Sequence, residues 1–452
     1  MIKSITLGMM LTIISIATLA STAVTPVTMD QTPTPPTSYT IKANQALYQD
    51  PQFNWQDNQD QEFAERGLIA TQPGLILKNT EGEVIWSNKE YDEFLHGKAP
   101  DTVNPSAWRH AVLNEIHGLF KVTDGVYQVR GQSMSNMTII EGKTGYIVID
   151  PSISPQNAHN NMDLVYQYIG KKPIVAVIYS HSHVDHFGGA RGIINDQEVQ
   201  SGQVMVIAYK DFLANAVSEN IISGNVMSRR ATYMYGHLLP KSTAEQIDAG
   251  EGKTTEMGDL TLIPPTHLIG PEGETMTIDG IKMQFEWAPG EASDELLIYL
   301  PDQKVLYVAD NTVHSVQNVY TIRGAKTRDS LAWYDSLNNI IAFNDAEFLV
   351  QGHNWPIFEQ ANIHEYLVNQ RDALKYVHDQ TLRLMNQGYT ADEIANMIHL
   401  PPNLANKWYL RPYYGNIKVN IKAIYAEYLG WYDGNPAHLD PMPPRATAQK
   451  NG

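Results

Sequence analysis

The chain has 452 residues, of which 43% are hydrophobic and 18% are charged, a composition typical of a globular protein with room for two or three domains. Its net charge of −17 repels nucleic acid and acidic lipid, so we expect neither as a partner. The absence of cysteine excludes disulfides, a lipoprotein anchor and thiolate metal ligands.

The first 23 residues have the pattern of a secretory signal peptide. Lys3 is followed by an apolar run from Ile5 to Leu19 and by the small residues Ser21 to Ala23. Because the run is short for a membrane span, we expect cleavage near Ala23 and no stable membrane anchor. An exported chain without disulfides suits a bacterial periplasm or secretion. A flexible leader rich in threonine and proline is predicted over residues 24–44.

Residues 45–360 are expected to form the main domain, with an N-terminal extension packed on it. Short β-rich stretches begin after Phe120, and a helical pattern then precedes another strand. This order indicates layered α/β packing. The stretches are Gly125 to Val129, Met137 to Ile140, Gly145 to Ile149, the helical Ala158 to Ile169, and the apolar Pro173 to Tyr179.

A histidine-rich loop follows the last of these strands. His181, His183, Asp185 and His186 lie within six positions, and Gly188 and Gly189 come directly after them. Neutral imidazole and carboxylate oxygen are ligands that zinc accepts. One metal cannot easily use four ligands from so short a loop, but two neighbouring metals can. The loop therefore predicts a binuclear metal site rather than an ordinary surface turn.

Three further metal-type side chains stand just past later β-rich stretches. Glu291 follows a turn signal, Asp310 follows the run Val305 to Ala309, and His353 follows Glu347 to Val350. Each alone is most simply a turn residue, but together they favour completion of the metal site. Because a zinc-bound water has a pKa near about 7, hydrolysis is the natural reaction class.

The last part of the chain, residues 361–452, is predicted to be a helical module. Asn362 to Gln387 has apolar residues at helical spacing, and Thr390 with Glu393 makes a capping box. Ile417, Ile421 and later apolar residues share one helical face. The many aromatic residues suggest a dimer surface, although burial against the module's own core is an equal alternative.

The motif H-x-H-x-D-H, with its later ligands, resembles the metallo-β-lactamase superfamily. Glu291 stands where that superfamily commonly has histidine, and this points to the alkylsulfatase branch. The resemblance implies an α/β fold, an αββα sandwich that carries the catalytic site in residues 45–360, and a helical dimerisation module. Segments similar to that branch are Asn225 to Ala231, Asn318 to Ala325, His353 to Pro356, His378 to Thr381 and Tyr432 to Pro436.

The resemblance also implies roles for individual residues. One Zn²⁺ would be held by His181, His183 and Glu291, and a second by Asp185, His186 and His353. Asp310 would bridge them, where the branch usually has glutamate. Asp185 would also orient the nucleophile. The sulfate contacts implied are Asn318, Val319, Tyr320, Thr321, Ile322, Arg323 and Arg328.

The implied activity is hydrolysis of a small sulfate ester to an alcohol and inorganic sulfate, by a homodimer with two Zn²⁺ per chain. The arginines fit this activity, because a guanidinium fork matches a sulfate and supplies local positive charge. Many relatives continue into a sterol-carrier-like domain. Because this chain stops soon after Pro444, a shorter or secondary alkyl ester or an aryl sulfate remains open beside long-chain detergents.

Two other functions are left open by the residues. The same metals could hydrolyse a carbonyl substrate, such as a lactam, lactone or thioester, and such chemistry would not need an arginine clamp. A periplasmic anion-binding or scaffold protein is the alternative outside the enzymes, and it would be expected to have lost metal ligands.

Overall fold

A computed structural model describes residues 33–451. The predicted signal peptide lies outside the described residues, as does the leader up to residue 32. Helix α1 (Ser38–Ala46) begins within the rest of the predicted leader, after residues 33–37, which form no helix or strand. The hydroxyl of Thr37 accepts a hydrogen bond from the Thr40 amide at 3.1 Å, which caps this helix.

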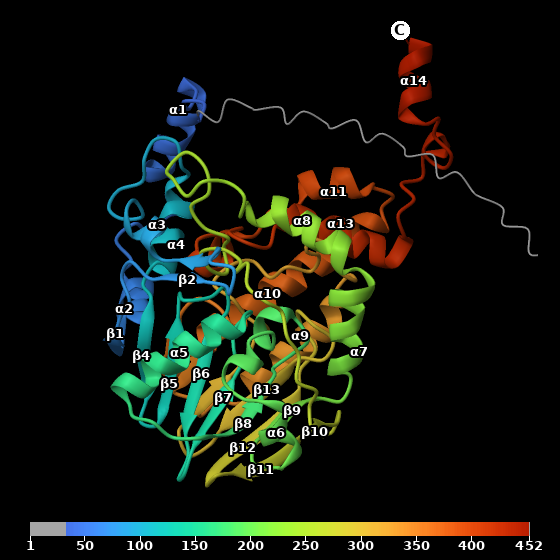
Figure 1. Ribbon diagram of the computed structural model, residues 1–452. Coiled ribbons are helices and arrows are strands. Elements are labelled where there is room, and N and C mark those ends of the chain that lie inside the picture. Colours follow the sequence, from blue (N-terminus) through green and yellow to red (C-terminus); the bar gives the residue numbers. More distant parts are fainter. Residues whose placement is uncertain (1–32, 452) are drawn as a thin grey trace, which may run out of the picture. The chain divides into compact units, whose positions relative to one another are not determined.

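Two large sheets and one small hairpin make up the β-structure (Figure 1). The first sheet has the order β1-β4-β5-β6-β7-β8-β9-β10, with strands Leu68–Ala70, Gly118–Thr123, Val126–Arg130, Met137–Glu141, Tyr146–Ile149, Ile174–Ile178, Met205–Tyr209 and His267–Ile269. The second sheet runs from β11 to β16 in sequence order, with strands Glu274–Ile278, Ile281–Trp287, Leu296–Leu300, Val305–Tyr307, Phe348–Val350 and Ile357–Phe358. The hairpin pairs β2 (Ile76–Lys78) with β3 (Val84–Ser87).

Strands β5, β6, β7 and β8 lie within one residue of the predicted β-rich stretches at each end. The N-terminal extension also joins the first sheet, because β1 pairs antiparallel with β4.

The two large sheets pack face to face through one apolar layer. Side chains from β5 to β9 of the first sheet meet side chains from β12 to β15 of the second. This layer consists of aliphatic and aromatic residues, as expected for two sheets that share a core. Its most buried members include Ile140, Ile147, Ile178, Ile207, Phe285, Ile298 and Tyr307.

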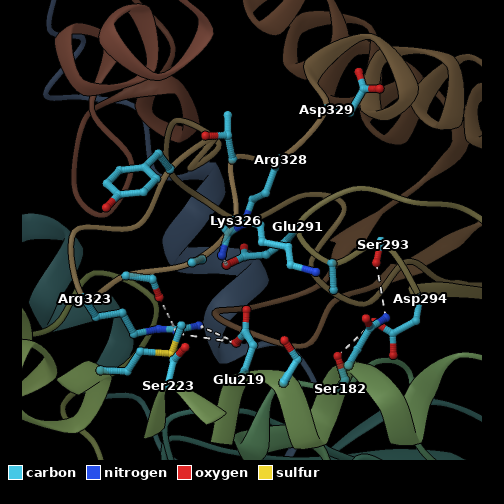
Figure 2. Close-up of a pocket in the computed structure, with 18 of the residues that line it drawn as sticks. Ser182, Glu219, Ser223, Glu291, Ser293, Asp294, Arg323, Lys326, Arg328 and Asp329 are labelled. Atoms are coloured by element: carbon cyan, nitrogen blue, oxygen red, sulfur yellow. Dashed lines mark hydrogen bonds and ion pairs between the residues drawn. The ribbon is translucent and has the colours of Figure 1, made fainter. Parts of the chain in front are cut away.

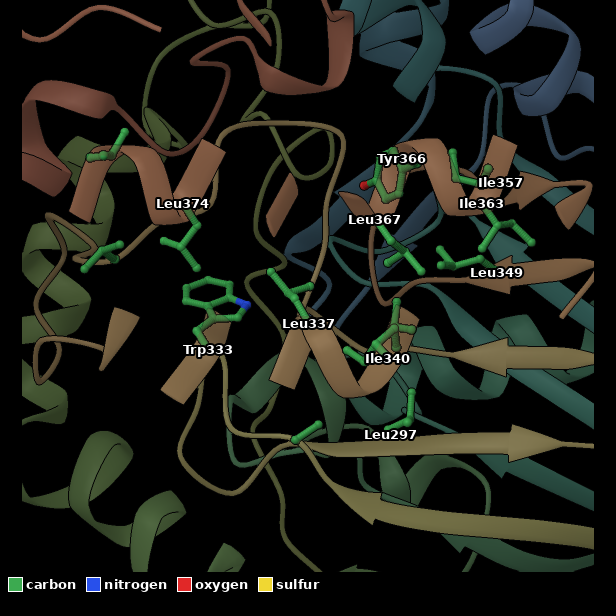
Figure 3. Close-up of a cluster of buried hydrophobic side chains, with 14 of the residues drawn as sticks. Leu297, Trp333, Leu337, Ile340, Leu349, Ile357, Ile363, Tyr366, Leu367 and Leu374 are labelled. Carbon is green, nitrogen blue, oxygen red and sulfur yellow. The ribbon is translucent and has the colours of Figure 1, made fainter. Parts of the chain in front are cut away.

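Helices cover the outer face of each sheet. The helices that follow α1 in the described part of the chain are α2 (Gln59–Glu65), α3 (Lys89–Asp92), α4 (Pro105–Asn114), α5 (Pro155–Tyr168), α6 (Asp196–Gln200), α7 (Phe212–Val217), α8 (Gly224–Tyr235), α9 (Ser330–Ile341), α10 (Gln360–Met385), α11 (Ala391–Met397), α12 (Pro402–Ala405), α13 (Ile417–Leu429) and α14 (Pro444–Asn451). Residues of α5, α6 and α7 pack on the first sheet. Residues of α9 and α10 pack on the second sheet (Figure 3), and residues of α13 belong to the same apolar cluster. The predicted αββα sandwich is therefore confirmed.

The helical C-terminal module shares its core with the rest of the unit. Leu367 and Leu374 of α10 lie in the same apolar cluster as Trp333 of α9 and Leu297 of β13 (Figure 3). Thr390 caps α11 with the predicted capping box. Among the described helices, none combines the length and apolar character needed to cross a bilayer.

The parallel strand pairs bring particular residues together at one edge. Strand β7 runs parallel to β8, and β14 runs parallel to β15. Asp150 and His181 follow the first pair, while Asp310 and His353 follow the second. Because the carboxyl ends of parallel strands face the same way, each pair presents polar residues at one edge of its sheet.

Candidate metal centre and anion site

The histidine loop leaves β8 and turns at once into a short 3₁₀ helix (Val184–His186). His181 and His186 are completely buried and His183 is nearly so. The Nε2 atom of His181 lies 2.8 Å from Nδ1 of His183, which leaves Nε2 of His183 facing away, toward Glu219 at 3.6 Å. The loop therefore presents converging ring nitrogens, as its spacing predicts.

Asp310 brings the late part of the site to this loop. Its Oδ2 lies 3.5 Å from His181 Nε2, 3.1 Å from His186 Nε2 and 3.2 Å from His353 Nε2. Asp185 approaches the other side, with Oδ2 3.3 Å from His186 Nε2 and 3.4 Å from His353 Nε2. One carboxylate thus touches two histidines of the early loop and a third histidine that lies far along the chain.

Two groups of potential metal ligands result. The first is His181, His183 and Asp310, and the second is Asp185, His186 and His353, with the ligand atoms of each group within 4.8 Å of one another. Six of the seven predicted metal ligands are thereby brought together. Because Asp310 also contacts His186 and His353, it occupies the position between the groups.

Glu291, the seventh predicted ligand, is placed differently. It is buried, but its Oε1 pairs with the Arg328 guanidinium at 2.7 Å and it belongs to neither group. It lines the same chamber as His183, Asp310 and His353. In this structure the Asp310 carboxylate, rather than that of Glu291, completes the group with His181 and His183.

The backbone at these strand exits is strained. Asp150, Ala309 and Asn354 have φ angles of 56°, 48° and 57°, values that non-glycine residues seldom adopt. Gly352 must be glycine for another reason, since a Cβ there would lie 2.3 Å from Asp310 Oδ1. Such strain is kept where the surroundings hold the chain in one geometry, and here it aims Asp310 and His353 inward.

Two buried carboxylates outside the ligand set hold it in place. Asp150 accepts hydrogen bonds from the Ser180 amide at 2.8 Å and the Tyr307 hydroxyl at 2.5 Å, and its Oδ2 is 2.7 Å from His186 Nδ1. Glu295 accepts from the Asp310 amide at 2.7 Å and the Glu291 amide at 2.9 Å. Sequence reasoning missed both residues. Their only local signal is that Asp150 ends a buried strand and Glu295 closes the same acidic turn as Glu291.

The electrostatics of the cluster suit a cation. Burial lowers the pKa of His181 to about 4, and nearby His186 adds to the shift, so this imidazole is a neutral ligand. Burial also lowers the pKa of His353, but the carboxylates of Asp310, Glu251 and Asp185 together outweigh burial and raise this pKa to about 10. Nε2 of His186 and Oδ1 of Asp310 are buried without a hydrogen-bond partner within residues 33–451. Metal ions would satisfy these atoms and balance the carboxylates, so the residues fit a binuclear metal centre.

The predicted sulfate-binding segment contributes two arginines and Tyr320 to a cavity beside the metal-ligand groups. Arg328 is buried, donates to the Asn318 carbonyl and pairs with Glu291. Arg323 is less buried and points at Glu219 (Figure 2). Tyr320, Arg323 and Arg328 line a cavity of about 530 Å³, and the amide nitrogen of the Asn318 side chain is buried without a partner among the described residues.

Four of the predicted sulfate contacts, Asn318, Val319, Thr321 and Ile322, are absent from the described linings of the two cavities. Val319 and Thr321 are fully buried, and Ile322 is half exposed. Val319 donates its amide to Asn420 Oδ1 at 3.0 Å and lies in the core under α9 and α13. Their contact with sulfate therefore stays a prediction, whereas Tyr320, Arg323 and Arg328 do line the larger cavity.

Two cavities meet at Arg323. The smaller, about 200 Å³, lies over the metal-ligand groups and is lined by His183, Asp185, Asp310 and His353 together with the apolar residues Met134, Ile153, Tyr235, Leu260 and Tyr414. The larger is the 530 Å³ cavity beside it. Both linings contain Glu219, Met227, Glu291 and Arg323. An anion held by Arg323 would therefore lie next to the candidate metal centre.

Known proteins resemble this chain over most of its length. Two family models match it, "Metallo-beta-lactamase superfamily" over residues 130–284 and "Alkyl sulfatase dimerisation" over residues 390–451. A linear primary-alkylsulfatase from Pseudomonas sp is 46% identical over 424 residues, which is 93% of this chain and 63% of that protein. The alkyl/aryl-sulfatase BDS1 from Saccharomyces cerevisiae is 45% identical over 415 residues, 91% of this chain and 64% of that protein.

A solved structure gives the same result at the level of the fold. The stereoselective inverting sec-alkylsulfatase Pisa1 from Pseudomonas sp. matches with a TM-score of 0.90 at 42% identity, over 94% of this chain and 67% of that one. The chain spans less than two thirds of the length of the two curated relatives above, with 63% and 64%.

Proposed function

Because the chain belongs to the alkylsulfatase branch of the metallo-β-lactamase superfamily, we propose that it hydrolyses alkyl sulfate esters to an alcohol and inorganic sulfate at two zinc ions. One observation carries the proposal. Arg323 lines the same chamber as His183, Asp185, Asp310 and His353, so an anion clamp and a candidate metal centre share one space.

The zinc ligands proposed are the two groups with Asp310 between them. His181, His183 and Asp310 would hold one ion, and Asp185, His186 and His353 the other. Zinc bound there supplies hydroxide at neutral pH and polarises a substrate oxygen. Asp150 fixes which nitrogen of His186 faces the centre, because its carboxylate occupies the other one.

The arginines supply the recognition of sulfate. A sulfate monoester spreads its negative charge over terminal oxygens, which a guanidinium fork matches with parallel hydrogen bonds. Arg323 and Arg328 would bind these oxygens and stabilise charge as the ester bond breaks. The Asp185 side chain, at the floor of the chamber, would orient the attacking group. A site of this kind provides the local positive charge that a chain with a net charge of −17 otherwise lacks.

A direct assay tests the proposal. Zinc-loaded full-length protein is incubated with octyl sulfate, dodecyl sulfate and a chromogenic cephalosporin, and we expect turnover of a sulfate ester. Turnover of the cephalosporin alone would instead establish the carbonyl alternative. Running the reaction in isotope-labelled water shows whether the label enters the alcohol or the sulfate, and therefore which bond breaks.

We also propose that the protein is an exported homodimer. The dimerisation model matches residues 390–451, and large apolar side chains are exposed there, with Trp431 75% exposed and Leu429 and Leu439 each 54% exposed. Light scattering on the purified protein tests the dimer, since a monomer at micromolar concentration would contradict it. Fractionation of the expressing cells, with sequencing of the mature N-terminus, tests export and cleavage near Ala23.

A further inference from the structure

Glu219 stands between the candidate metal centre and the anion site. It lies in a π-helical turn (Ser218–Ile222) that joins α7 to α8. Its Oε2 is 3.5 Å from both terminal nitrogens of Arg323 (Figure 2). The same oxygen is 3.6 Å from Nε2 of His183. Single π-turns in helices occur often at functional sites. This one carries the acidic side chain that touches both halves of the site.

The carboxylate occupies the donors that a sulfate group would need. The two terminal nitrogens of Arg323 converge on one oxygen of Glu219, and Nη1 also donates to the Gly324 carbonyl at 3.1 Å. A carboxylate and a sulfate both present oxygen pairs to a guanidinium fork, so they compete for the same hydrogens. Arg323 cannot offer its full fork to a substrate while Glu219 holds it.

The competition for Arg323 takes place at the boundary between the two cavities. Glu219, Met227, Glu291 and Arg323 are the residues that line both cavities, so the Glu219–Arg323 pair belongs to the partition between them. The Glu219 side chain is still 24% exposed, which leaves it space to move. When Arg323 is taken by another anion, His183 Nε2 remains as a donor close to the displaced carboxylate.

We propose that Glu219 acts as a resident anion of the sulfate site, holding Arg323 while the site is empty and yielding it to the sulfate group of the substrate. This inference rests on the proposed function for the identity of the anion. It makes Glu219 a specificity-determining residue. To displace the carboxylate, a ligand must carry at least as much negative charge and present its oxygens to the guanidinium equally well. Neutral esters therefore gain no binding free energy from Arg323, and weakly charged esters gain little.

The test measures sulfate binding as well as turnover. Inorganic sulfate is titrated into zinc-loaded full-length protein by calorimetry for wild type, Glu219→Gln, Arg323→Ala and the double variant. We expect Glu219→Gln to bind sulfate about two- to five-fold more tightly, the range for losing a competing, partly exposed ion pair. KM for octyl sulfate should fall by the same factor. The gain should vanish in the Arg323→Ala background, since the competition acts through that guanidinium.

Controls separate this effect from charge and from folding. Glu272→Gln, in an exposed turn, makes the same change in net charge and should leave sulfate affinity unchanged. Should Glu219→Gln fail to fold, Glu219→Asp keeps the charge but withdraws the carboxylate by one methylene, and it should tighten sulfate binding by a smaller factor.

The outcomes are distinct. Unchanged or weaker sulfate binding in a folded, zinc-loaded Glu219 variant overturns the inference, even if the protein hydrolyses sulfate esters. Tighter binding in the variant without any ester turnover by wild type would leave Glu219 as the resident anion and remove the proposed function alone. A gain that persists without Arg323 also overturns the inference, because the carboxylate would then act through another group.

Discussion

The two halves of the candidate site are held by different means. On the metal side, His181, His186, Asp310 and His353 are almost fully buried at strand exits and are tied by Asp150 and Glu295. On the anion side, Arg323 lies on a loop, is 16% exposed, and is held by Glu219 and by the carbonyl of its own neighbour, Gly324. Arg328 belongs with the metal side in this respect, since it is buried against Glu291.

This contrast indicates that the metal side of the site is rigid and that the anion side can rearrange. Metal ligands must keep fixed positions before any ion arrives, and a buried network attached to sheets provides that. Substrate groups must enter and leave, so their clamp is on loops and a helical turn with partly exposed ion pairs. Five substitutions test this contrast, and those expected to change function most come first.

Asp310→Ala should have the largest effect. The carboxylate contacts three histidines, so its removal takes a candidate ligand from the group with His181 and His183 and leaves three buried rings without their common partner. We expect a loss of metal affinity and turnover larger than the roughly 10–100-fold that outer partners of metal ligands cost. Zinc content by atomic absorption and turnover of octyl sulfate measure it. A variant that keeps both zinc and activity would falsify the bridging position.

Arg328→Ala and Arg323→Ala form the sharpest pair. Both should lower kcat/KM for a sulfate ester by about 10²–10³, as expected for a lost charge-stabilising donor. Their stabilities should differ, because loss of Arg328 leaves Glu291 buried and unpaired, at a cost of about 3–5 kcal/mol in the metal-free protein. Loss of Arg323 breaks a partly exposed pair worth at most about 1 kcal/mol. Denaturant unfolding without metal compares the two, and equal losses would erase the contrast between buried and adaptable clamp residues.

Asp150→Asn should affect metal binding indirectly, through His186. The change keeps the size of the side chain but weakens its contact with His186 Nδ1. We expect a fall in zinc affinity of about 10–100-fold, with sulfate affinity of the fully loaded protein unchanged. Competition with a chromogenic chelator measures zinc binding. Unaltered zinc affinity would mean that the loop geometry alone orients His186.

Thr390→Ala should have the smallest effect. The hydroxyl accepts from the Glu393 amide in the capping box of α11, far along the chain from either half of the site. Removing such a cap costs about 1 kcal/mol of stability and should change neither zinc content nor KM. Thermal unfolding and a standard assay check this. A change in KM would show that the helical module influences the anion side.

Local patterns in the sequence were enough to place several of the strands and the ligand-bearing loops. Short β-rich runs bounded by turn residues located β5 to β8 to within one residue, and the positions just after strands singled out Asp310 and His353. The π-helical turn carrying Glu219 was not predicted, because it lacks a regular apolar period. The placement of Val319 and Thr321 in the interior was also missed, since neighbours in a loop point in directions that only their surroundings decide.

The amino-acid sequence was sufficient to identify the chemistry available to this protein. It places imidazoles and carboxylates just after strands, supplies Arg323 and Arg328 for an anion, and contains no cysteine. Tertiary structure alone decided that Asp310 stands among the histidines while Glu291 faces Arg328, and that Glu219 holds Arg323. The reason is physical. Residue types and short-range periods are local properties, whereas these pairings join side chains 37 to 129 positions apart and depend on how the two sheets and the turn after α7 pack together.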